Sequence, residues 1–492
     1  MKLKNYINPF EKTTGAAIFA KPKGIFWLFI GALFSALIIV KLKLIGVGLL
    51  IVLLFGAIYL YFLFKTPILG FYTAIGVNFV ILGLSRYLTI SLPVGFAVDG
   101  IIGLTFLALI FSRFRERVDW SPVNKTITIL AGIWLLYCIL QIVNPEAKKI
   151  EPWIAGRGIG FYFFFFLVLT FMLVNTNKRL DTFLYVWGVF SILATLKGVM
   201  QLFLGPDYAE QAWLNSGGAE THLLFGKLRV FSFFSDAGQF GANQGYAGVV
   251  FLIYSMVKRG STRIFFLIVA ILGFYGLIIS GTRGALAVPF AGLATFFVLR
   301  KNIKVLTLGA IVVGLIFIFL KYTTIANGNY QVRRMRTAFD PDNPSLQVRL
   351  RNQKILADYL ASRPFGGGIG HAGVKAQRFL PNAFLSQVPT DSWYVLIWAE
   401  LGIVGLTFHL FILFFVVGTA SYKVMFNIRD PVTKLKMSAL ISGMVGIILA
   451  SYGNAVLGGM PTSLLFYASM AIVSNPETFE QKTVEKPELI TE

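Results

Sequence analysis

The chain has 492 residues, of which 56% are apolar and only 13% are charged. Soluble domains carry about 25% charged residues, so the composition argues against a soluble globular enzyme and against a disordered chain. The single cysteine, Cys138, excludes an intramolecular disulfide and a thiolate metal cluster. The formal charge of +22 would suggest nucleic acid as the partner of a soluble protein, but membrane proteins collect Lys and Arg in cytoplasmic loops, so we expect no nucleic-acid partner.

Apolar runs long enough to cross about 30 Å of hydrocarbon recur along the chain. They predict an all-α polytopic membrane protein with about 12–14 transmembrane helices. The polar, basic first 24 residues and the lack of a cleavage site after them predict an uncleaved anchor rather than a signal peptide. The fourteen runs cover residues 24–40, 44–64, 67–84, 95–111, 127–143, 158–174, 183–204, 242–257, 264–280, 284–299, 305–320, 393–417, 437–452 and 457–473.

The distribution of Lys and Arg predicts the orientation. With the N-terminus in the cytoplasm, the cytoplasmic segments hold 24 of these residues and the short loops on the other side hold 9. This bias predicts that both termini are cytoplasmic.

The predicted organisation has five parts. Residues 1–157 form N-terminal transmembrane helices, 158–321 core helices with arginine sites, 322–392 an extracytoplasmic loop, 393–474 C-terminal helices and 475–492 a cytoplasmic tail. The loop is far longer than a usual connection, and long ordered loops tend to carry function. Residues 205–241 form the next longest segment on the same side.

Within the long loop, residues 344–363 are predicted to form a helix that lies on the membrane surface or caps the bundle. Arg351, Lys354 and Asp358 share one face, and the helix ends at Arg363-Pro364. Another face, at 3.6 residues per turn, is apolar: Val348, Ile355, Leu356, Tyr359 and Leu360.

Gly368 to Gly373 satisfy GxGxxG, but the motif follows a helix and a proline instead of a strand, so we expect no dinucleotide site. Two interpretations remain open. The glycines let backbone amides approach an anionic ligand, as in a nest, or they form a tight turn over the bundle.

Arg283, in SGTRGA (280–285), stands at the outer junction of two apolar runs. An arginine so close to hydrocarbon is costly unless it is paired, snorkels or faces a polar cavity. The small neighbours leave its guanidinium room to bind two oxygens of a phosphate. Arg229 and Arg157 also precede apolar runs, where each is a ligand for an anion or a lipid-headgroup anchor.

A basic cluster in the long loop lies on the side where topology does not explain positive charge. It is a solvated or headgroup-binding face, or it binds an anionic substrate. Its members are Arg333, Arg334, Arg336, Arg349 and Arg351.

Asp391 directly precedes the run 393–417, between Thr390 and Ser392. It is either an N-cap or a carboxylate that accepts a proton during catalysis. Glu400 falls on the opposite face of the same helix and is expected to be a buried structural acid.

His222 and His371 lie outside the runs, and either could act as a general base near neutral pH, whereas His409 is expected to pack inside a span. Lys197 and Asp99 are intramembrane polar sites, and Lys197 could reach an extracytoplasmic pocket. HExxH, DxD-like and Walker patterns are missing from the sequence, so we expect neither a metal nor a cofactor.

The order of these motifs resembles the O-antigen ligase and polymerase superfamily of bacterial membrane glycosyltransferases. The resemblance covers residues 158–418. It is carried by the segments 349–370 (ending in RPFGGGIG), 391–396 (DSWYVL) and 398–406 (WAELGIVGL), with SGTRGA (280–285) and RVFSF (229–233) similar to the two arginine sites of the family.

The resemblance implies a metal-independent, inverting transfer of a glycan from undecaprenyl diphosphate to a saccharide hydroxyl on the outer face of the bacterial inner membrane. Arg229 and Arg283 would hold the diphosphate and stabilise its charge as it leaves. Asp391 would be the acceptor-activating base. The other candidates for contact with the substrate are Arg349 and Arg351 and, with weaker support, Arg157, Lys197, Arg333, Arg334 and His371.

Family ligases usually carry His-Asn where this chain has Asp391-Ser392, which favours a polymerase over a ligase. The expected partners are a polyprenyl-diphosphate-linked glycan donor, a saccharide or lipid-linked saccharide acceptor, and membrane lipids. A glycan or lipid transporter is the alternative. Many transporters are built from repeats with sites at the membrane midplane, whereas this chain concentrates its unexplained charge in one outside loop.

Overall fold

The computed structural model describes residues 22–87, 94–112, 118–224, 226–328, 330–337 and 344–480. The regular structure in these residues is helical, which confirms the predicted all-α class, apart from one short antiparallel hairpin. The hairpin pairs β1 (Leu223–Leu224) with β2 (Lys227–Leu228). The chain divides into two compact units, Met1–Thr66 and Pro67–Glu492.

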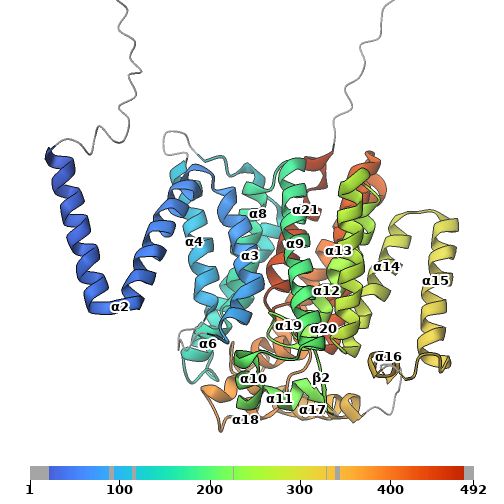
Figure 1. Ribbon diagram of the computed structural model, residues 1–492. Helices are drawn as coiled ribbons and strands as arrows, with labels where there is room; N and C mark the ends of the chain where they lie inside the picture. Colours follow the sequence, from blue (N-terminus) through green and yellow to red (C-terminus); the bar gives the residue numbers. More distant parts are fainter. Residues whose placement is uncertain are drawn as a thin grey trace, which may run out of the picture. The chain divides into compact units, whose positions relative to one another are not determined.

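The first unit contains the helix α2 (Pro22–Lys65), which has 44 residues. At 1.5 Å per residue the helix is about 66 Å long, about twice the hydrocarbon thickness. Both predicted runs, 24–40 and 44–64, lie in this unbroken helix, and Figure 1 shows it bent into two limbs. Residues 1–21, which make up most of the polar, basic N-terminal segment, lie outside the described residues.

The second unit is a bundle of helices joined by short turns. Its α-helices are α3 (Ile68–Leu84), α4 (Gly95–Ser112), α5 (Thr126–Leu140), α6 (Glu151–Gly156), α7 (Gly158–Phe161), α8 (Leu167–Leu173), α9 (Asn177–Phe203), α10 (Tyr208–Trp213), α11 (Ala219–His222), α12 (Ala237–Ser255), α13 (Gly260–Ile279), α14 (Ala287–Leu299), α15 (Ile303–Tyr322), α16 (Tyr330–Arg336), α17 (Pro344–Leu360), α18 (Phe384–Gln387), α19 (Trp393–Tyr422), α20 (Pro431–Gly453) and α21 (Thr462–Ser474). The 3₁₀ turns are η1 (Ser121–Val123), η2 (Gln141–Val143), η5 (Arg283–Leu286), η7 (Val374–Arg378) and η9 (Pro476–Phe479), and the π turns are η3 (Tyr162–Phe166), η4 (Leu214–Gly218) and η8 (Lys423–Asn427).

Every apolar run predicted after residue 66 overlaps a helix, although the last run begins at residue 457 and its helix α21 only at Thr462. Among the described residues, six helices are long and apolar enough to cross a membrane, and six further apolar helices are shorter. The six long ones are Thr126–Val143, Glu151–Leu173, Asn177–Phe203, Gly260–Ile279, Trp393–Asn427 and Pro431–Gly453. The polytopic architecture is therefore confirmed.

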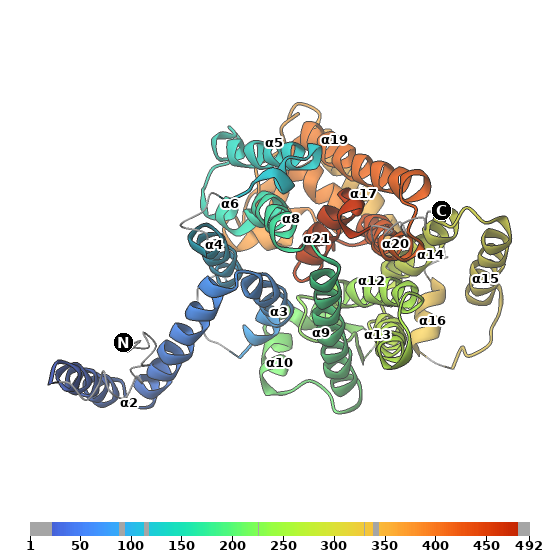
Figure 2. The same ribbon diagram turned by 90° about the horizontal axis from the view of Figure 1, so that it is seen from above.

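The helix α12 lies at the centre of the bundle and is buried on all sides, with Leu252 its one residue that is not fully buried. It packs against α13, α14 and α20 (Figure 2). Glycines permit this packing: a Cβ on Gly273 would lie 2.8 Å from the backbone nitrogen of Gly248. Small residues let helix backbones approach closely in membrane bundles.

The connections sort onto the two ends of the bundle as the charge distribution predicts. At one end, Asp181 binds both Lys258 and Lys436, and Lys423 binds Glu477 at 3.1 Å. These residues all come from segments predicted to share the cytoplasmic side. The other end carries α10, α11, α16, α17 and α18 (Figure 1), and we call the described residues of 204–236 and 323–392 the loop face.

The predicted helix of the long loop is confirmed as α17, although it ends at Leu360 rather than Arg363. The α conformation is disfavoured before a proline, here Pro364, which explains the earlier stop. Leu356 and Leu360 are buried against α18 and α19. Val348 is 54% exposed, so only the C-terminal half of the apolar face packs on the bundle.

The glycine-rich turn after α17 packs against a break in α19. Gly402 has φ +68°, and a Cβ there would lie 2.0 Å from the carbonyl oxygen of Pro364. The amides of Gly367 and Gly368 donate to the carbonyls of Ala399 and Glu400, at 2.9 and 2.8 Å. The turn therefore satisfies carbonyls that the break in α19 leaves without a helical partner.

Candidate functional site

Three arginines from three elements meet at the turn between α13 and η5. Arg229 Nη2 donates to Thr282 Oγ1 at 3.0 Å, and Arg334 Nε donates to the carbonyl oxygen of Gly281. Arg283 is the next residue of the turn. Gly281 has φ +60°, a left-handed conformation that favours glycine. The structure thus brings together Arg229 and Arg283, the two arginines predicted as the principal ligands, and adds Arg334.

The guanidinium of Arg229 lies in an electropositive, half-buried position. Burial, and then the nearby charge of Arg334, lower the pKa of Arg229 to about 10. Its Nε is buried and has no hydrogen-bond partner among the described residues. Nη1 donates to the Thr221 carbonyl oxygen at 2.9 Å, so Thr221 and Thr282 hold the guanidinium in place, and a fixed guanidinium suits the binding of an oxyanion.

Asp236 provides a negative charge beside these arginines and caps the N-terminus of α12. Its carboxylate accepts hydrogen bonds from the Gln239 amide at 2.9 Å and from Ser235 Oγ at 2.7 Å. Burial alone would raise the pKa of Asp236, but Lys375 and these hydrogen bonds lower it below its usual value. The site therefore contains a carboxylate that is ionised at neutral pH.

Arg349 and Asp391 form a second charged pair on the loop face. Arg349 Nε lies 3.4 Å from Asp391 Oδ2, and the Asp391 side chain is 49% exposed. Asp391 is not the N-cap of α19: Ser392 holds that position, and its side chain makes no capping hydrogen bond. The cap interpretation of Asp391 is therefore wrong, because the chain enters the helix one residue later.

Asn454, at the C-terminal end of α20, lies between the two charged groups. Its Nδ2 would lie 2.4 Å from a Cβ on Gly284, so the glycine after Arg283 makes room for this amide. A Cβ on Gly453 would lie 3.4 Å from Gly284 Cα and 3.9 Å from Arg349 Nη1. The Asn454 Nδ2 donor is buried and has no partner among the described residues, a property that it shares with Arg229 Nε.

Two of the predicted basic residues lie away from the site and are held by carboxylates. Arg157 is buried, binds Asp99 through Nε at 2.7 Å, and covers the ring of Phe96. Lys197 Nζ lies 2.8 Å from an oxygen of Asp207. Both cations are thus neutralised within the bundle.

Two further predicted arginines point to the surface of the loop face. Arg333 is exposed, and its Nη1 lies 3.5 Å from the carbonyl oxygen of Asn327. Arg351 is exposed on α17. The basic cluster therefore divides: Arg334 and Arg349 join the site, these two face outward, and Arg336 donates to Thr323 and to the Ile325 carbonyl just after α15.

The hydrogen bonds of the glycine turn favour the interpretation as a tight turn over the bundle, because its amides bind the protein itself and not an anionic substrate. Two of its amides bond carbonyls of α19, and the Gly373 amide donates to the Leu385 carbonyl at 2.9 Å. The backbone N–H groups of Gly370 and Ala372 face the carboxyl of Glu400. Glu400 is 3% exposed, which confirms the prediction of a buried acid.

The histidines predicted as possible bases are buried and held by the backbone. His371 Nδ1 lies 3.0 Å from the Ile369 carbonyl, and His222 Nδ1 lies 2.9 Å from the Gly218 carbonyl. Burial lowers the pKa of both histidines. His409 is a buried residue of α19, and its Nε2 accepts a hydrogen bond from Trp393 Nε1 at 3.0 Å. This agrees with the prediction that His409 packs inside a span.

The described residues contain no group of three or more His, Cys, Asp or Glu side chains that could hold a metal ion. A cavity of about 250 Å³ lies at the end of the bundle opposite the loop face and contains none of the predicted site residues. It is lined mainly by the ends of α8 and α21.

Sequence reasoning missed Asp236, Asn454 and Arg86, whose guanidinium donates to the carbonyls of Ser232 and Phe234 in the segment that links Arg229 to Asp236. The pattern Asp236-Ala-Gly-Gln239 resembles a capping box and could have marked the start of α12. No sequence signal links Asn454 or Arg86 to the arginines, since both reach the loop face through long-range packing.

The fold and the site define an α-helical polytopic membrane protein with an arginine cluster next to an ionised carboxylate, Asp236. The family model described as O-antigen ligase matches residues 266–410, which include Arg283, Arg334, Arg349 and Asp391. The chain is 23% identical over 331 residues to the O-antigen polymerase of Salmonella muenchen, covering 65% of this chain and 80% of that protein. Both matches confirm the resemblance found from the motif order, and they support an enzyme of the O-antigen polymerase or ligase type.

Proposed function

We propose that this protein transfers a glycan from a polyprenyl diphosphate to a saccharide hydroxyl on the extracytoplasmic face of the bacterial inner membrane. The observation that carries the proposal is the convergence of Arg229, Arg283 and Arg334 on the turn between α13 and η5, beside the loop face. Undecaprenyl diphosphate is the carrier that we assign to the donor.

The arginines bind the diphosphate and stabilise it as a leaving group. A diphosphate gains negative charge when its bond to the anomeric carbon breaks, and fixed donors that face this charge stabilise the transition state. Guanidinium groups suit the role because they bind two phosphate oxygens at once. In this proposal the arginines, and no metal ion, provide the neutralising charge.

Asp391 is the candidate base for the acceptor. The acceptor hydroxyl oxygen forms a bond to the anomeric carbon, the carbon–oxygen bond to the diphosphate breaks, and its electron pair leaves with the diphosphate. The hydroxyl proton passes to the Asp391 carboxylate. Attack on the face opposite the leaving group inverts the anomeric configuration.

We favour a polymerase over a ligase. Asp391-Ser392 stands where family ligases usually carry His-Asn, and the curated relative is named an O-antigen polymerase. The acceptor is then a second lipid-linked glycan.

The test is the glycan profile of a deletion strain complemented with wild type, Arg283→Ala or Arg378→Ala. Arg378 is an exposed arginine of η7 on the same face and serves as the matched control. We expect wild type and Arg378→Ala to restore long chains, and Arg283→Ala to leave single repeat units on the lipid carrier.

The other outcomes decide between the alternatives. Long chains that remain on the carrier and are missing from their acceptor would identify a ligase. If Arg283→Ala kept the lipid-linked donor from reaching the outer face, the protein would be a transporter, and unchanged glycans would overturn both the transfer reaction and the arginine assignment.

A further inference from the structure

The segment that carries Arg229 and Asp236 follows an unusual path between β2 and α12. Ser232, midway along it, is fully buried and has φ +52°, which is unfavourable for any residue other than glycine. Its Oγ donates to the carbonyl of Ala194 in α9 at 2.6 Å. Such a turn persists only when its surroundings hold it in place.

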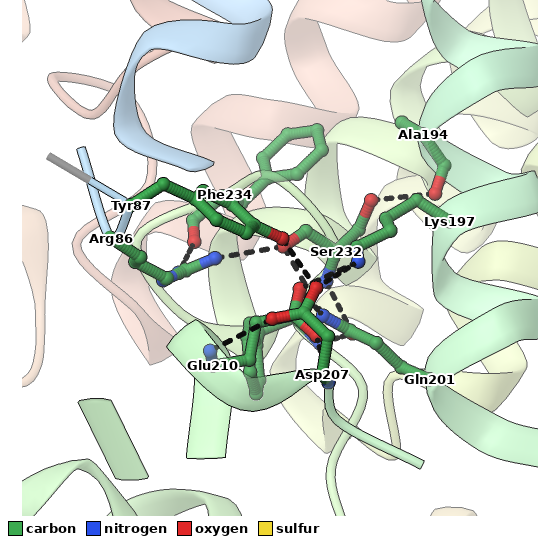
Figure 3. Close-up of polar contacts among 10 residues, drawn as sticks. Arg86, Tyr87, Ala194, Lys197, Gln201, Asp207, Glu210, Ser232 and Phe234 are labelled. Atoms are coloured by element: carbon green, nitrogen blue, oxygen red, sulfur yellow. Dashed lines mark hydrogen bonds and ion pairs between the residues drawn. The ribbon is translucent and has the colours of Figure 1, made fainter. Parts of the chain in front are cut away.

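Gln201 of α9 holds the two backbone amides at this turn. Its Oε1 accepts from the amides of Phe231 and Ser232, at 3.2 and 2.8 Å (Figure 3). Its Nε2 donates to Glu210 Oε1 at 2.8 Å. Gln201 and Glu210 are each 1% exposed, so water cannot replace these hydrogen bonds.

Arg86, which follows α3, holds the carbonyls of the same turn. Its Nη1 donates to the Ser232 carbonyl at 2.9 Å and its Nη2 to the Phe234 carbonyl (Figure 3). The guanidinium carbon lies 4.6 Å from the ring centroid of Trp213 and 4.5 Å from that of Phe231. Burial lowers the pKa of Arg86 to about 10, so the group stays charged at neutral pH.

The remaining charges around the turn balance one another. Lys197 Nζ lies 2.8 Å from Asp207 Oδ2 and 3.1 Å from Glu210 Oε1, and the Tyr87 hydroxyl donates to Asp207 (Figure 3). Burial would raise the pKa of Asp207, but the hydrogen bonds from Lys197 and Tyr87 lower it to about 2. The two cations of this group, Arg86 and Lys197, are balanced by two carboxylates, those of Asp207 and Glu210. The group therefore has no net positive charge with which to bind a phosphate.

We propose that Gln201 and Arg86 are positioning residues, which fix the turn at Ser232 and thereby hold the Arg229 guanidinium against Thr282 for the transfer reaction. The inference rests on the proposed function and assigns to that site a support built by α9 and the segment after α3. The support acts through Arg229 and does not touch the donor.

The test is a double-mutant cycle with the purified full-length protein in lipid, measuring initial rates of transfer from the lipid-linked donor. The positioning variant is Gln201→Leu, combined with Arg229→Lys and, separately, with Arg283→Lys. The matched control is Gln244→Leu, because Gln244 is equally buried but bonds Ser191 and Thr195 within the bundle. Arg86→Lys is the second variant: it keeps the charge but cannot hold both carbonyls in a fork.

We expect Gln201→Leu to slow transfer about 100-fold, as a misplaced site residue does. In the Arg229→Lys background, adding Gln201→Leu should slow transfer by less than about 2-fold. In the Arg283→Lys background, it should again slow transfer about 100-fold. Gln244→Leu should stay within about 3-fold of wild type. If the rates of the arginine variants are too low, the affinity for inorganic pyrophosphate is to be measured in the same cycle.

The failures of the two proposals are distinguishable. Suppose that Arg229→Lys and Arg283→Lys both slow transfer. If Gln201→Leu then lowers the rate by the same factor in every background, Gln201 has only a structural role. The same conclusion follows if the control Gln244→Leu is as slow as Gln201→Leu. If neither arginine variant slows transfer or weakens pyrophosphate binding, the proposed function itself is wrong.

Discussion

At the scale of single residues, the ion pair between Arg349 and Asp391 is the feature that the proposed chemistry depends on most. The pair is long, at 3.4 Å, and the carboxylate is half exposed. A pair of this kind contributes about 0–1 kcal/mol to stability. Its charge can therefore be removed with little effect on folding, which makes the base assignment testable.

We predict that Asp391→Asn reduces transfer about 100-fold or more, because the amide keeps the shape of the side chain but cannot accept a proton. The thermal unfolding midpoint in detergent should stay within a few degrees of that of the wild type. Asp358→Asn, an exposed aspartate on α17, is the control and should keep full activity. Full activity of Asp391→Asn would remove Asp391 from the reaction.

Sequence motifs predicted the site residues that stand out from their own neighbours in the chain. The remaining site residues can be recognised only from the packing of elements that are distant in sequence. Arg283 stands out because it interrupts apolar sequence, and Arg229 because its segment resembles a family motif. Arg334 could not be ranked above Arg333 from the sequence, because only the packing of α16 on the Gly281–Thr282 turn selects one of the two. Asn454 is an ordinary helix-terminal residue until Gly284 is seen to face it.

At the scale of elements, the break in α19 and the glycine turn beside it form one structural unit. The break leaves carbonyls of an apolar helix without helical partners, and the amides of Gly367 and Gly368 satisfy two of them. Gly402 is required on two grounds, its left-handed backbone and its contact with Pro364.

We predict that Gly402→Ala destabilises the protein by about 2 kcal/mol or more, since the backbone at φ +68° and ψ −173° costs a residue other than glycine about 1–3 kcal/mol and the Cβ would clash with the Pro364 carbonyl. Gly418→Ala, in the same helix, meets open space and is the control; alanine should be neutral or slightly stabilising there. Thermal unfolding of both variants in detergent would check this. A Gly402→Ala midpoint equal to that of the control would contradict the role of the break.

The length of the apolar runs predicted the membrane helices, and apolar periodicity predicted α17, because both patterns can be read directly from the sequence. The fourteen runs overlap helices, and α17 begins at the predicted residue. The break at Gly402 was not predicted, because the apolar run continues on both sides of it and the conformation of the break is set by contact with a loop distant in sequence. The two first runs merge in α2 because Lys41 and Lys43 do not interrupt a helix.

At the scale of the whole molecule, the second unit separates its connections into two chemically different ends. The segments predicted as cytoplasmic gather at one end, and the arginine site lies at the other. The arrangement agrees with the charge bias, which assigns the loop face to the extracytoplasmic side.

We predict that Ala357→Cys, exposed on α17, reacts with a membrane-impermeant thiol reagent in intact spheroplasts, whereas Ser261→Cys, at the start of α13, reacts only after permeabilisation. Both variants are to be made in a Cys138→Ala background, although the native thiol is buried. The reverse pattern of labelling would place the arginines in the cytoplasm and contradict the proposed location of the reaction.

The hydrogen bonds between the glycine turn and α19 also limit how the loop face can open. Pulling residues 364–368 away would strand carbonyls of α19 in an apolar region, and each stranded group costs several kcal/mol. In the proposed reaction, residues 364–368 are therefore expected to stay in place while substrates bind to the loop face. The same contact that satisfies the broken helix thus also fixes one part of the loop face to the bundle.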